Sequence, residues 1–308
     1  MRIERTAARA CRGEKPPRRL QIYLHPGVAG AEALAKEMSS HLRGLGVRAE
    51  AVPTDDEAAM ALIPAQDMLA VVGGDGTLLR VGGLAAPHGI PVLGVNLGRL
   101  GFLAEVQPSD WKAVLARILV GDYWIEKRTM LRTEHYRGDD MLGSYDVLNE
   151  AVVSRGALAR PIRLHTMIDG DQLTTYVADG LIAATATGST AYALAVGGPI
   201  LPPELNNILI IPIAPHLCVE RAIVLSPGVT LQIHVRTDHQ AILSADGQVE
   251  VPLQNDDLVV VRKSPFITRF ARVQDPVYFY RNLTSRMSQN PAAEEPDAAR
   301  VTWKKKAA

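Results

Sequence analysis

The sequence predicts an N-terminal doubly wound parallel α/β domain followed by a C-terminal β-rich, layered (sandwich-like) domain. Up to about residue 120, short apolar strands alternate with segments of helical spacing, which is typical of parallel βαβ units. After about Tyr123 the chain changes to short β-branched segments separated by turns such as Asp169-Gly170 and Asp246-Gly247.

The elements of the α/β part follow from apolar periodicity. Four short apolar runs predict buried strands at residues 20–24, 47–52, 68–72 and 91–95. Helical spacing predicts helices at residues 30–45, 56–62, 77–84 and 109–119, the last with Ser109 as its N-cap.

The β-rich part shows neither an internal repeat nor a heptad pattern. Its β-branched runs predict strands at residues 148–153, 162–168, 174–176, 181–184, 209–213, 229–235 and 258–261.

The composition limits the possible partners. The 308 residues include 33 Lys plus Arg and 33 Asp plus Glu, so no overall field attracts nucleic acid or a membrane surface. No apolar run approaches the roughly 20 residues that span a bilayer. Cys11 and Cys218 are too few for a disulfide scaffold or a zinc site, which favours a reducing cytoplasm.

The most informative motif is Gly73-Gly74-Asp75-Gly76-Thr77, which directly follows a predicted buried strand. An Asp-Gly pair is often only a hairpin turn. Here the next segment has helical spacing, and a helix starting near Thr77 would point its free N–H groups at an anion. Arg80, one turn further on, would add a positive charge. The motif therefore predicts a phosphate-binding loop at the carboxyl edge of the sheet.

Two further segments are candidates for nucleotide contacts. Residues 179–199 concentrate small and hydroxyl side chains, which suit close packing against a flat ring, although a tight turn between core strands would look similar. Asn149-Glu150 ends an apolar run and could bind an adenine edge and a ribose, or be an ordinary strand end. The histidines lack metal-ligand spacing, and neither a P-loop nor a G-x-S-x-G motif is present.

Taken together and in this order, the motifs resemble those of the NAD kinase family, whose members phosphorylate NAD to NADP with ATP or polyphosphate. The Gly-Gly-Asp-Gly-Thr element is shared with diacylglycerol and sphingosine kinases and related phosphofructokinases, whereas Thr-Gly-Ser-Thr-Ala-Tyr is far more specific to NAD kinases. The matching segments are residues 73–77, 94–103, 149–150, 179–199, 212–216 and 246–247.

The resemblance implies roles for individual residues. Asp75 would be the catalytic residue, contacting the adenosine ribose of NAD and accepting the proton of its 2′-hydroxyl. The loop at the donor phosphates would consist of Gly73, Gly74, Gly76 and Thr77. The other NAD-binding residues implied, besides Asp75 and Gly76, are Arg80, Phe102, Asn149, Glu150, Arg160, Asp179, Thr187, Thr190, Ala191, Tyr192, Ala195 and Gln248. Asp179 would meet the nicotinamide end, in this family often across a subunit boundary.

The resemblance also implies partners and cofactors. NAD and ATP would be the small-molecule partners, and Mg²⁺ would be carried on the nucleotide phosphates without a cage of protein ligands. The protein would form a homodimer or homotetramer. Ala186 stands where the family commonly has Pro, and Ala193 and Ala195 where Ser is frequent, which leaves the choice between NAD and NADH open.

Two other functions fit parts of the sequence. A lipid kinase of the diacylglycerol or sphingosine type would share the Gly-Gly-Asp-Gly-Thr element but not the Thr190-Ala191-Tyr192 segment. A non-catalytic NAD(H)-binding regulator would have no need of a carboxylate at position 75.

Five regions are expected along the chain. They are a flexible basic arm (residues 1–19), the α/β domain with the phosphate loop (20–124), the β-rich domain for NAD binding and oligomerisation (125–274), a segment returning to the N-terminal domain (275–288) and a disordered polar tail (289–308).

Overall fold

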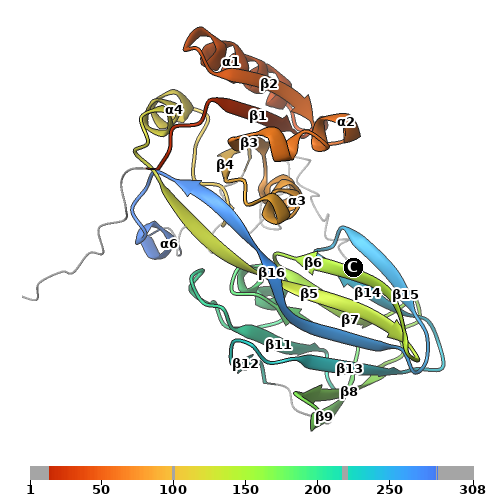
Figure 1. Ribbon diagram of the computed structural model, residues 1–308. Helices are drawn as coiled ribbons and strands as arrows, with labels where there is room; N and C mark the ends of the chain where they lie inside the picture. Colours follow the sequence, from red (N-terminus) through yellow and green to blue (C-terminus); the bar gives the residue numbers. More distant parts are fainter. Residues whose placement is uncertain (1–13, 99–100, 217–220, 282, 284–308) are drawn as a thin grey trace, which may run out of the picture.

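The computed structural model describes residues 14–98, 101–216, 221–281 and 283 (Figure 1). The predicted polar tail and the first 13 residues of the predicted arm lie outside the described residues.

The N-terminal lobe alternates strands and helices, as predicted. Its elements are β1 (Arg19–Leu24), α1 (Ala31–Gly44), β2 (Arg48–Pro53), α2 (Glu57–Met60), η1 (Ile63–Ala65), β3 (Met68–Gly73), α3 (Asp75–Ala85), η2 (Ala86–His88), β4 (Val92–Asn96) and α4 (Trp111–Leu119).

The four strands of this lobe are parallel and run in the order β2-β1-β3-β4. Successive residues of a strand point to opposite faces, and both faces are covered. Ala70 packs on the side of α1 and α4, while Leu69 and Val71 pack on the side of α2 and α3. The helices therefore lie on both faces of the sheet, which confirms the doubly wound prediction.

The C-terminal lobe consists mainly of strands. Its elements are β5 (Trp124–Arg137), β6 (Asp140–Val147), β7 (Glu150–Arg155), β8 (Ile162–Ile168), β9 (Asp171–Ala178), β10 (Gly180–Ala184), η3 (Gly188–Thr190), α5 (Tyr192–Ala195), β11 (Ile208–Ile213), β12 (Ile223–Leu225), β13 (Leu231–Arg236), β14 (Ala241–Ala245), β15 (Val249–Leu253), β16 (Leu258–Arg272) and α6 (Tyr278–Arg281).

Two sheets face each other in this lobe. One is a six-stranded sheet in the order β12-β11-β10-β7-β14-β15. The other contains β5, β6, β8, β9, β13 and β16. Residues from both, among them Val153 and Ile210 of the first and Leu164 and Val259 of the second, form one buried cluster. This packing confirms the layered β-rich prediction.

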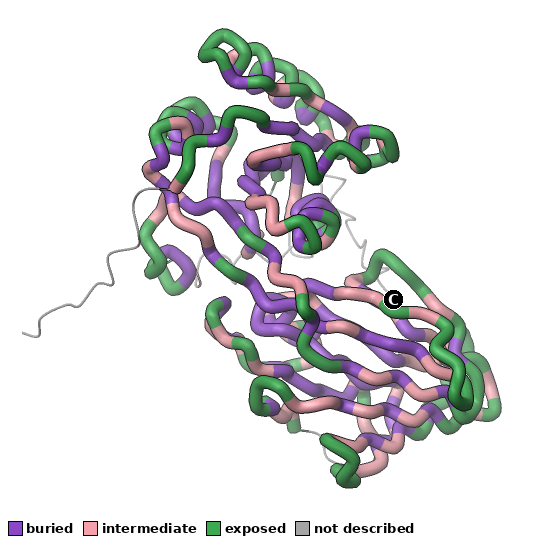
Figure 2. Tube along the Cα trace, in the orientation of Figure 1, coloured by how far each residue is buried: buried purple, intermediate pink, exposed green. Residues whose placement is uncertain are grey.

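The two lobes share a continuous ten-stranded sheet. β16 pairs with β5 along most of its length and with β13 near its start, and at Phe270 it pairs in parallel with Val92 of β4. β5 and β16 thus form a long ribbon that runs from one lobe into the other (Figure 1). Figure 2 shows buried segments along this ribbon and exposed turns at the far end of the β-rich lobe.

Several predicted boundaries were wrong. α3 begins at Asp75, inside the glycine motif, and not at Thr77. The N-cap of α4 is Asp110, whose neighbour Ser109 donates a hydrogen bond to the Asp110 carboxylate at 2.8 Å and caps no backbone group. The predicted strand 148–153 begins two residues later, at Glu150, and Leu148 and Asn149 form the bend that joins β6 to β7.

The described end of the predicted flexible arm is fixed to the α/β lobe. The Tyr123 hydroxyl donates to the Lys15 carbonyl at 2.9 Å, and the Arg18 N–H donates to the Asp67 carboxylate at 2.9 Å. None of the helices in the described residues is long and apolar enough to cross a membrane.

Candidate active site

The glycine motif forms the junction between β3 and α3. Gly73 is the last residue of β3, and Gly74 is the extended N-cap residue of α3, so Asp75 opens the first helical turn. A Cβ at Gly73 would lie 2.8 Å from the Thr77 hydroxyl oxygen, which explains the glycine at this position. The loop therefore presents the positive end of α3 at the carboxyl edge of the parallel sheet.

The Asp75 carboxylate binds the backbone of a second loop. It accepts hydrogen bonds from the N–H groups of Phe102 at 2.6 Å, Leu103 at 3.2 Å and Ala104 at 3.3 Å. A Cβ at Gly101 would overlap the carboxylate, so this approach requires glycine. Because a carboxylate has about four lone-pair sites, three donors orient it and leave room for a hydroxyl.

Asn149 lies against the hydroxyl-rich segment. Its carbonyl accepts the Thr185 N–H at 2.8 Å, and the Thr185 hydroxyl donates to the Leu148 carbonyl at 2.6 Å. A Cβ at Gly188 would overlap the Asn149 carbonyl. The segment around Thr187 is thus packed directly on the Asn149-Glu150 pair.

Asp246 holds this pair in place from a hairpin turn. At φ 53° in the turn between β14 and β15, its carboxylate accepts the N–H groups of Leu148 at 2.8 Å, Asn149 at 2.8 Å and Glu150 at 3.0 Å. The sequence identified Asp246-Gly247 as a turn but not this function. The one feature of the sequence that pointed to it was an Asp in a turn, because Asp tolerates the left-handed backbone conformation and can bind nearby N–H groups.

The acidic groups here have perturbed proton affinities. Burial, followed by the Asp246 charge, raises the pKa of Glu150 to about 8, against a hydrogen bond from the Tyr192 backbone. Burial raises the pKa of Asp246 to about 6, although three backbone N–H groups act in the opposite direction. Glu150 is therefore protonated at neutral pH and can donate a hydrogen bond.

These contacts form two clusters: the Asp75 cluster (Asp75 with residues 102–104) and the Asn149 cluster (Asn149, Glu150, Thr185 and Asp246). Most of the remaining predicted residues are near one of these clusters in the sequence. Thr187 precedes the η3 turn and Thr190 ends it. Ala191 is the N-cap residue of α5, and Tyr192 and Ala195 are its first and last residues. Gln248 follows the Asp246 turn, Arg80 is exposed on α3, and the Phe102 ring lies 6.4 Å from the Phe279 ring, between centroids.

Asp179 and Arg160 are not brought to these clusters within one chain. Asp179 precedes β10 and pairs with Arg155 at 2.9 Å, whereas Thr185 follows the other end of β10, roughly 20 Å away at strand spacing. The Arg160 carbonyl accepts a hydrogen bond from His239 at 3.0 Å, and its side chain is exposed.

Three buried charged residues that the sequence did not single out lie between the clusters: Glu126 and Arg128 on β5, and Arg272 at the end of β16. The sequence contains one feature that points to two of them. Glu126 and Arg128 have opposite charges and are two residues apart, which places them on the same face of a strand.

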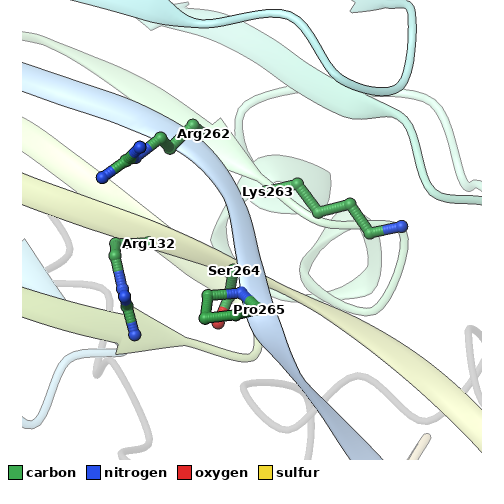
Figure 3. Close-up of a pocket in the computed structure, with 5 residues that line it drawn as sticks. All are labelled: Arg132, Arg262, Lys263, Ser264 and Pro265. Atoms are coloured by element: carbon green, nitrogen blue, oxygen red, sulfur yellow. The ribbon is translucent and has the colours of Figure 1, made fainter.

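A separate cavity of about 340 Å³ lies along the ribbon, lined by Arg132, Arg262, Lys263, Ser264 and Pro265 (Figure 3). Figure 3 shows Lys263 pointing away from the two arginines. Arg132 pairs with Asp146 and Arg262 with Glu134, so their charges are already matched. None of the predicted site residues lines this cavity. In the described part of the chain, no group of three or more His, Cys, Asp or Glu side chains could hold a metal ion.

Comparison with known proteins agrees with this geometry. The family model described as ATP-NAD kinase N-terminal domain matches residues 6–123, and that of the ATP-NAD kinase C-terminal domain matches residues 148–273. The NAD kinase of Chloroflexus aggregans is 37% identical over 273 residues, which cover 88% of this chain and 99% of the relative. That of Heliobacterium modesticaldum is 45% identical over 224 residues, covering 72% and 79%.

The chain belongs to the NAD kinase family. The resemblance seen in the sequence is therefore confirmed, and with it the assignment as a kinase. The alternative of a lipid kinase or a silent binding protein is not favoured.

Solved structures of NAD kinases share the fold. An Archaeoglobus fulgidus NAD kinase in complex with ATP superimposes with a TM-score of 0.71 at 27% identity, covering 88% of this chain and 98% of that one. Yeast NADH kinase complexed with NADH gives a TM-score of 0.77 at 24% identity, covering 94% and 91%, and supports the fold alone.

Proposed function

We propose that this NAD kinase transfers the γ-phosphoryl group of ATP to the 2′-hydroxyl of the adenosine ribose of NAD, giving NADP and ADP. The observation that carries the proposal is the Asp75 carboxylate, held at the start of α3 by three N–H groups of residues 102–104. The complex of the Archaeoglobus fulgidus NAD kinase with ATP supports ATP as the donor.

In this mechanism Asp75 accepts the proton of the 2′-hydroxyl as the ribose oxygen attacks the γ-phosphorus. The bond from the γ-phosphorus to the bridging oxygen breaks, and ADP leaves. Phosphoryl transfer depends mainly on alignment and charge neutralisation. The N-terminal turn of α3 would supply the N–H groups of Gly74 and Gly76 to the phosphates, whereas the Thr77 N–H already donates to the Gly74 carbonyl at 3.1 Å.

The NAD molecule would bind between the two clusters. Asn149 offers both a donor and an acceptor, and the protonated Glu150 would donate to a ligand oxygen or ring nitrogen. Thr187, Thr190, Ala191 and Tyr192 would line the adenine and ribose pocket. Arg80, Phe102, Ala195 and Gln248 remain more peripheral candidates.

Mg²⁺ fits this site only as a cation carried by the triphosphate. Three N–H donors already engage the Asp75 carboxylate, which leaves little of it for a metal. Magnesium keeps several waters and needs few protein ligands, and it would neutralise phosphate charge when bound.

Asp179 and Arg160 support a homo-oligomer. Asp179 lies at the far end of β10 from the Asn149 cluster, and Arg160 lies in the β7–β8 loop, which leaves the sheet at that same end. We therefore assign them to the nicotinamide end of an NAD molecule bound mainly by a partner subunit.

The test is the Asp75→Asn variant with ATP, Mg²⁺ and NAD. Formation of NADP should fall by at least about 100-fold, because the hydroxyl loses its base, while the dissociation constant for NAD from calorimetry should change little. Asp139→Asn, at an exposed turn position, is the matched control and should keep the wild-type rate. A near-normal rate for Asp75→Asn would show that this carboxylate is not the base.

A further inference from the structure

Four charged side chains lie buried where the β5–β16 ribbon enters the α/β lobe. Glu105 accepts the Val273 N–H at 2.7 Å, and the other three are joined to one another by hydrogen bonds. Glu126 is 7% exposed, Arg128 2% and Arg272 0%. The Glu126 carboxylate accepts hydrogen bonds from Arg128 Nη2 at 3.0 Å and from Arg272 Nε at 2.8 Å. One carboxylate thus joins two guanidinium groups from neighbouring strands.

Each arginine has a second contact, and the two contacts lie in different parts of the candidate site. Arg272 Nη1 donates to the Leu103 carbonyl at 2.6 Å, while the Leu103 N–H binds the Asp75 carboxylate. Arg128 Nη1 donates to the Thr187 hydroxyl oxygen at 3.2 Å. A continuous path of hydrogen bonds therefore connects Thr187 in one lobe with Asp75 in the other.

The surroundings keep these charges in place. Although burial raises it, the Arg272 and Arg128 charges hold the pKa of Glu126 below its ordinary value. The Arg272 guanidinium also lies 4.9 Å from the centre of the Phe270 ring and 5.3 Å from that of Tyr278, so aromatic faces cover it.

Stability alone is a weak reason for such a network. Replacing a buried ion pair by well-packed apolar residues is often neutral or stabilising, because desolvating the charges costs as much as their attraction returns. What apolar residues cannot do is fix the direction of a carbonyl or a hydroxyl. The contacts to Leu103 and Thr187 are directional contacts of this kind.

We propose that Arg128, Glu126 and Arg272 are positioning residues that set the 102–104 loop, and through it the Asp75 carboxylate, relative to Thr187. This inference rests on the proposed role of Asp75. Because the Thr187 oxygen accepts from Arg128, its hydroxyl proton is turned away from the arginine and is free to donate to the ligand.

The test is Arg272→Lys, which keeps the charge but cannot bind Glu126 and Leu103 in the same forked geometry. We expect kcat to fall by about 10- to 100-fold, as expected for a misplaced reacting group, with less than about a threefold change in the calorimetric dissociation constant for NAD. Amide hydrogen exchange at Phe102 and Leu103 should become faster.

The matched control is Arg132→Lys on β5, the other strand of the ribbon. Arg132 also forms a forked pair, with Asp146 at 3.1 and 2.8 Å, but makes no contact with the candidate site. This variant should keep the wild-type kcat and the wild-type exchange at residues 102–104. A loss of kcat in both variants would show a general effect of weakening the ribbon and would overturn the proposal.

A second variant keeps the proposal testable if Arg272→Lys does not fold. Arg128→Lys should raise the dissociation constant for NAD by at least about threefold, since Thr187 loses its directing partner. A folded Arg272→Lys with normal kcat and exchange, or a folded Arg128→Lys with normal NAD affinity, contradicts the network. If Asp75→Asn itself remains active, the proposed function fails first, and the two failures are thereby distinguished.

Discussion

At the residue scale, two aspartates at separate places each bind a backbone loop through the side-chain carboxylate. Asp75 and Asp246 each accept N–H groups from three successive residues, 102–104 and 148–150. The sequence could predict the importance of Asp75, because its glycines are adjacent in the chain. It could not predict the hydrogen bonds of Asp246, because its partners lie almost 100 residues earlier.

The Glu150 carboxyl group makes stability depend on pH. Its pKa is about 8 in the folded protein against 4.5 for the ordinary group, so the folded state holds the proton more tightly. The free energy of unfolding is then highest at low pH and falls as pH rises through this window, by at most about 1.4 kcal/mol per pH unit. Above pH 8 the contribution is lost.

Urea unfolding of the wild type and Glu150→Gln between pH 6 and pH 8 checks this expectation. Above pH 7 Asp246, whose pKa is about 6, is mostly ionised, so the upper half of that range reports mainly on Glu150. The wild type should lose stability relative to Glu150→Gln as pH rises. Parallel curves for the two proteins would show that Glu150 is ionised in the fold.

At the element scale, continuous apolar runs were predicted well, whereas the charged strand β5 and short strands such as β14 were not. β3 reads as a continuous apolar run and lies buried along its whole length, as expected. β5 was missed because Glu126, Arg128 and Glu134 interrupt its apolar pattern. Glu126 pairs with Arg272 and Glu134 with Arg262, and both partners are more than 100 positions away in the sequence.

Helix α3 offers a direct test of how it packs on β16. A Cβ at Gly82 would lie 3.1 Å from the Thr268 methyl carbon, whereas one at Gly83 would meet nothing within 4 Å. Gly83→Ala should raise the free energy of unfolding by up to about 1 kcal/mol, because alanine favours the helix. Gly82→Ala should lower it by about 1 kcal/mol or more through crowding. Denaturant titrations that move both variants the same way would contradict this packing.

At the scale of the whole molecule, the fold class followed from local patterns, but the join between the lobes did not. Alternating elements and turn spacing predicted the two architectures correctly. The parallel pairing of Phe270 with Val92 joins segments nearly 180 residues apart. Neither segment contains a sequence pattern that predicts this pairing. The placement of the site residues on both sides of that join, and their roles, stay predictions.

A shared sheet should make the molecule unfold as one unit. Met130 and Phe270 of the ribbon belong to the same buried cluster as Leu69 and Leu78 of the α/β lobe. In a Trp124→Phe, Trp303→Phe background, fluorescence of Trp111 reports on the α/β lobe, while amide hydrogen exchange in β8, β9 and β13 reports on the β-rich lobe. We expect the two signals to give coincident denaturant transitions. Separated midpoints would mean that the lobes unfold independently.

The ribbon of β5 and β16 also limits how this enzyme can change shape. Swivelling one lobe against the other would twist two antiparallel strands at once and break the ladder between them. A bulge between Lys263 and Ile267 is where the ladder is already interrupted, so any bending would concentrate there. We therefore expect substrate entry to depend on surface loops more than on movement of one lobe against the other.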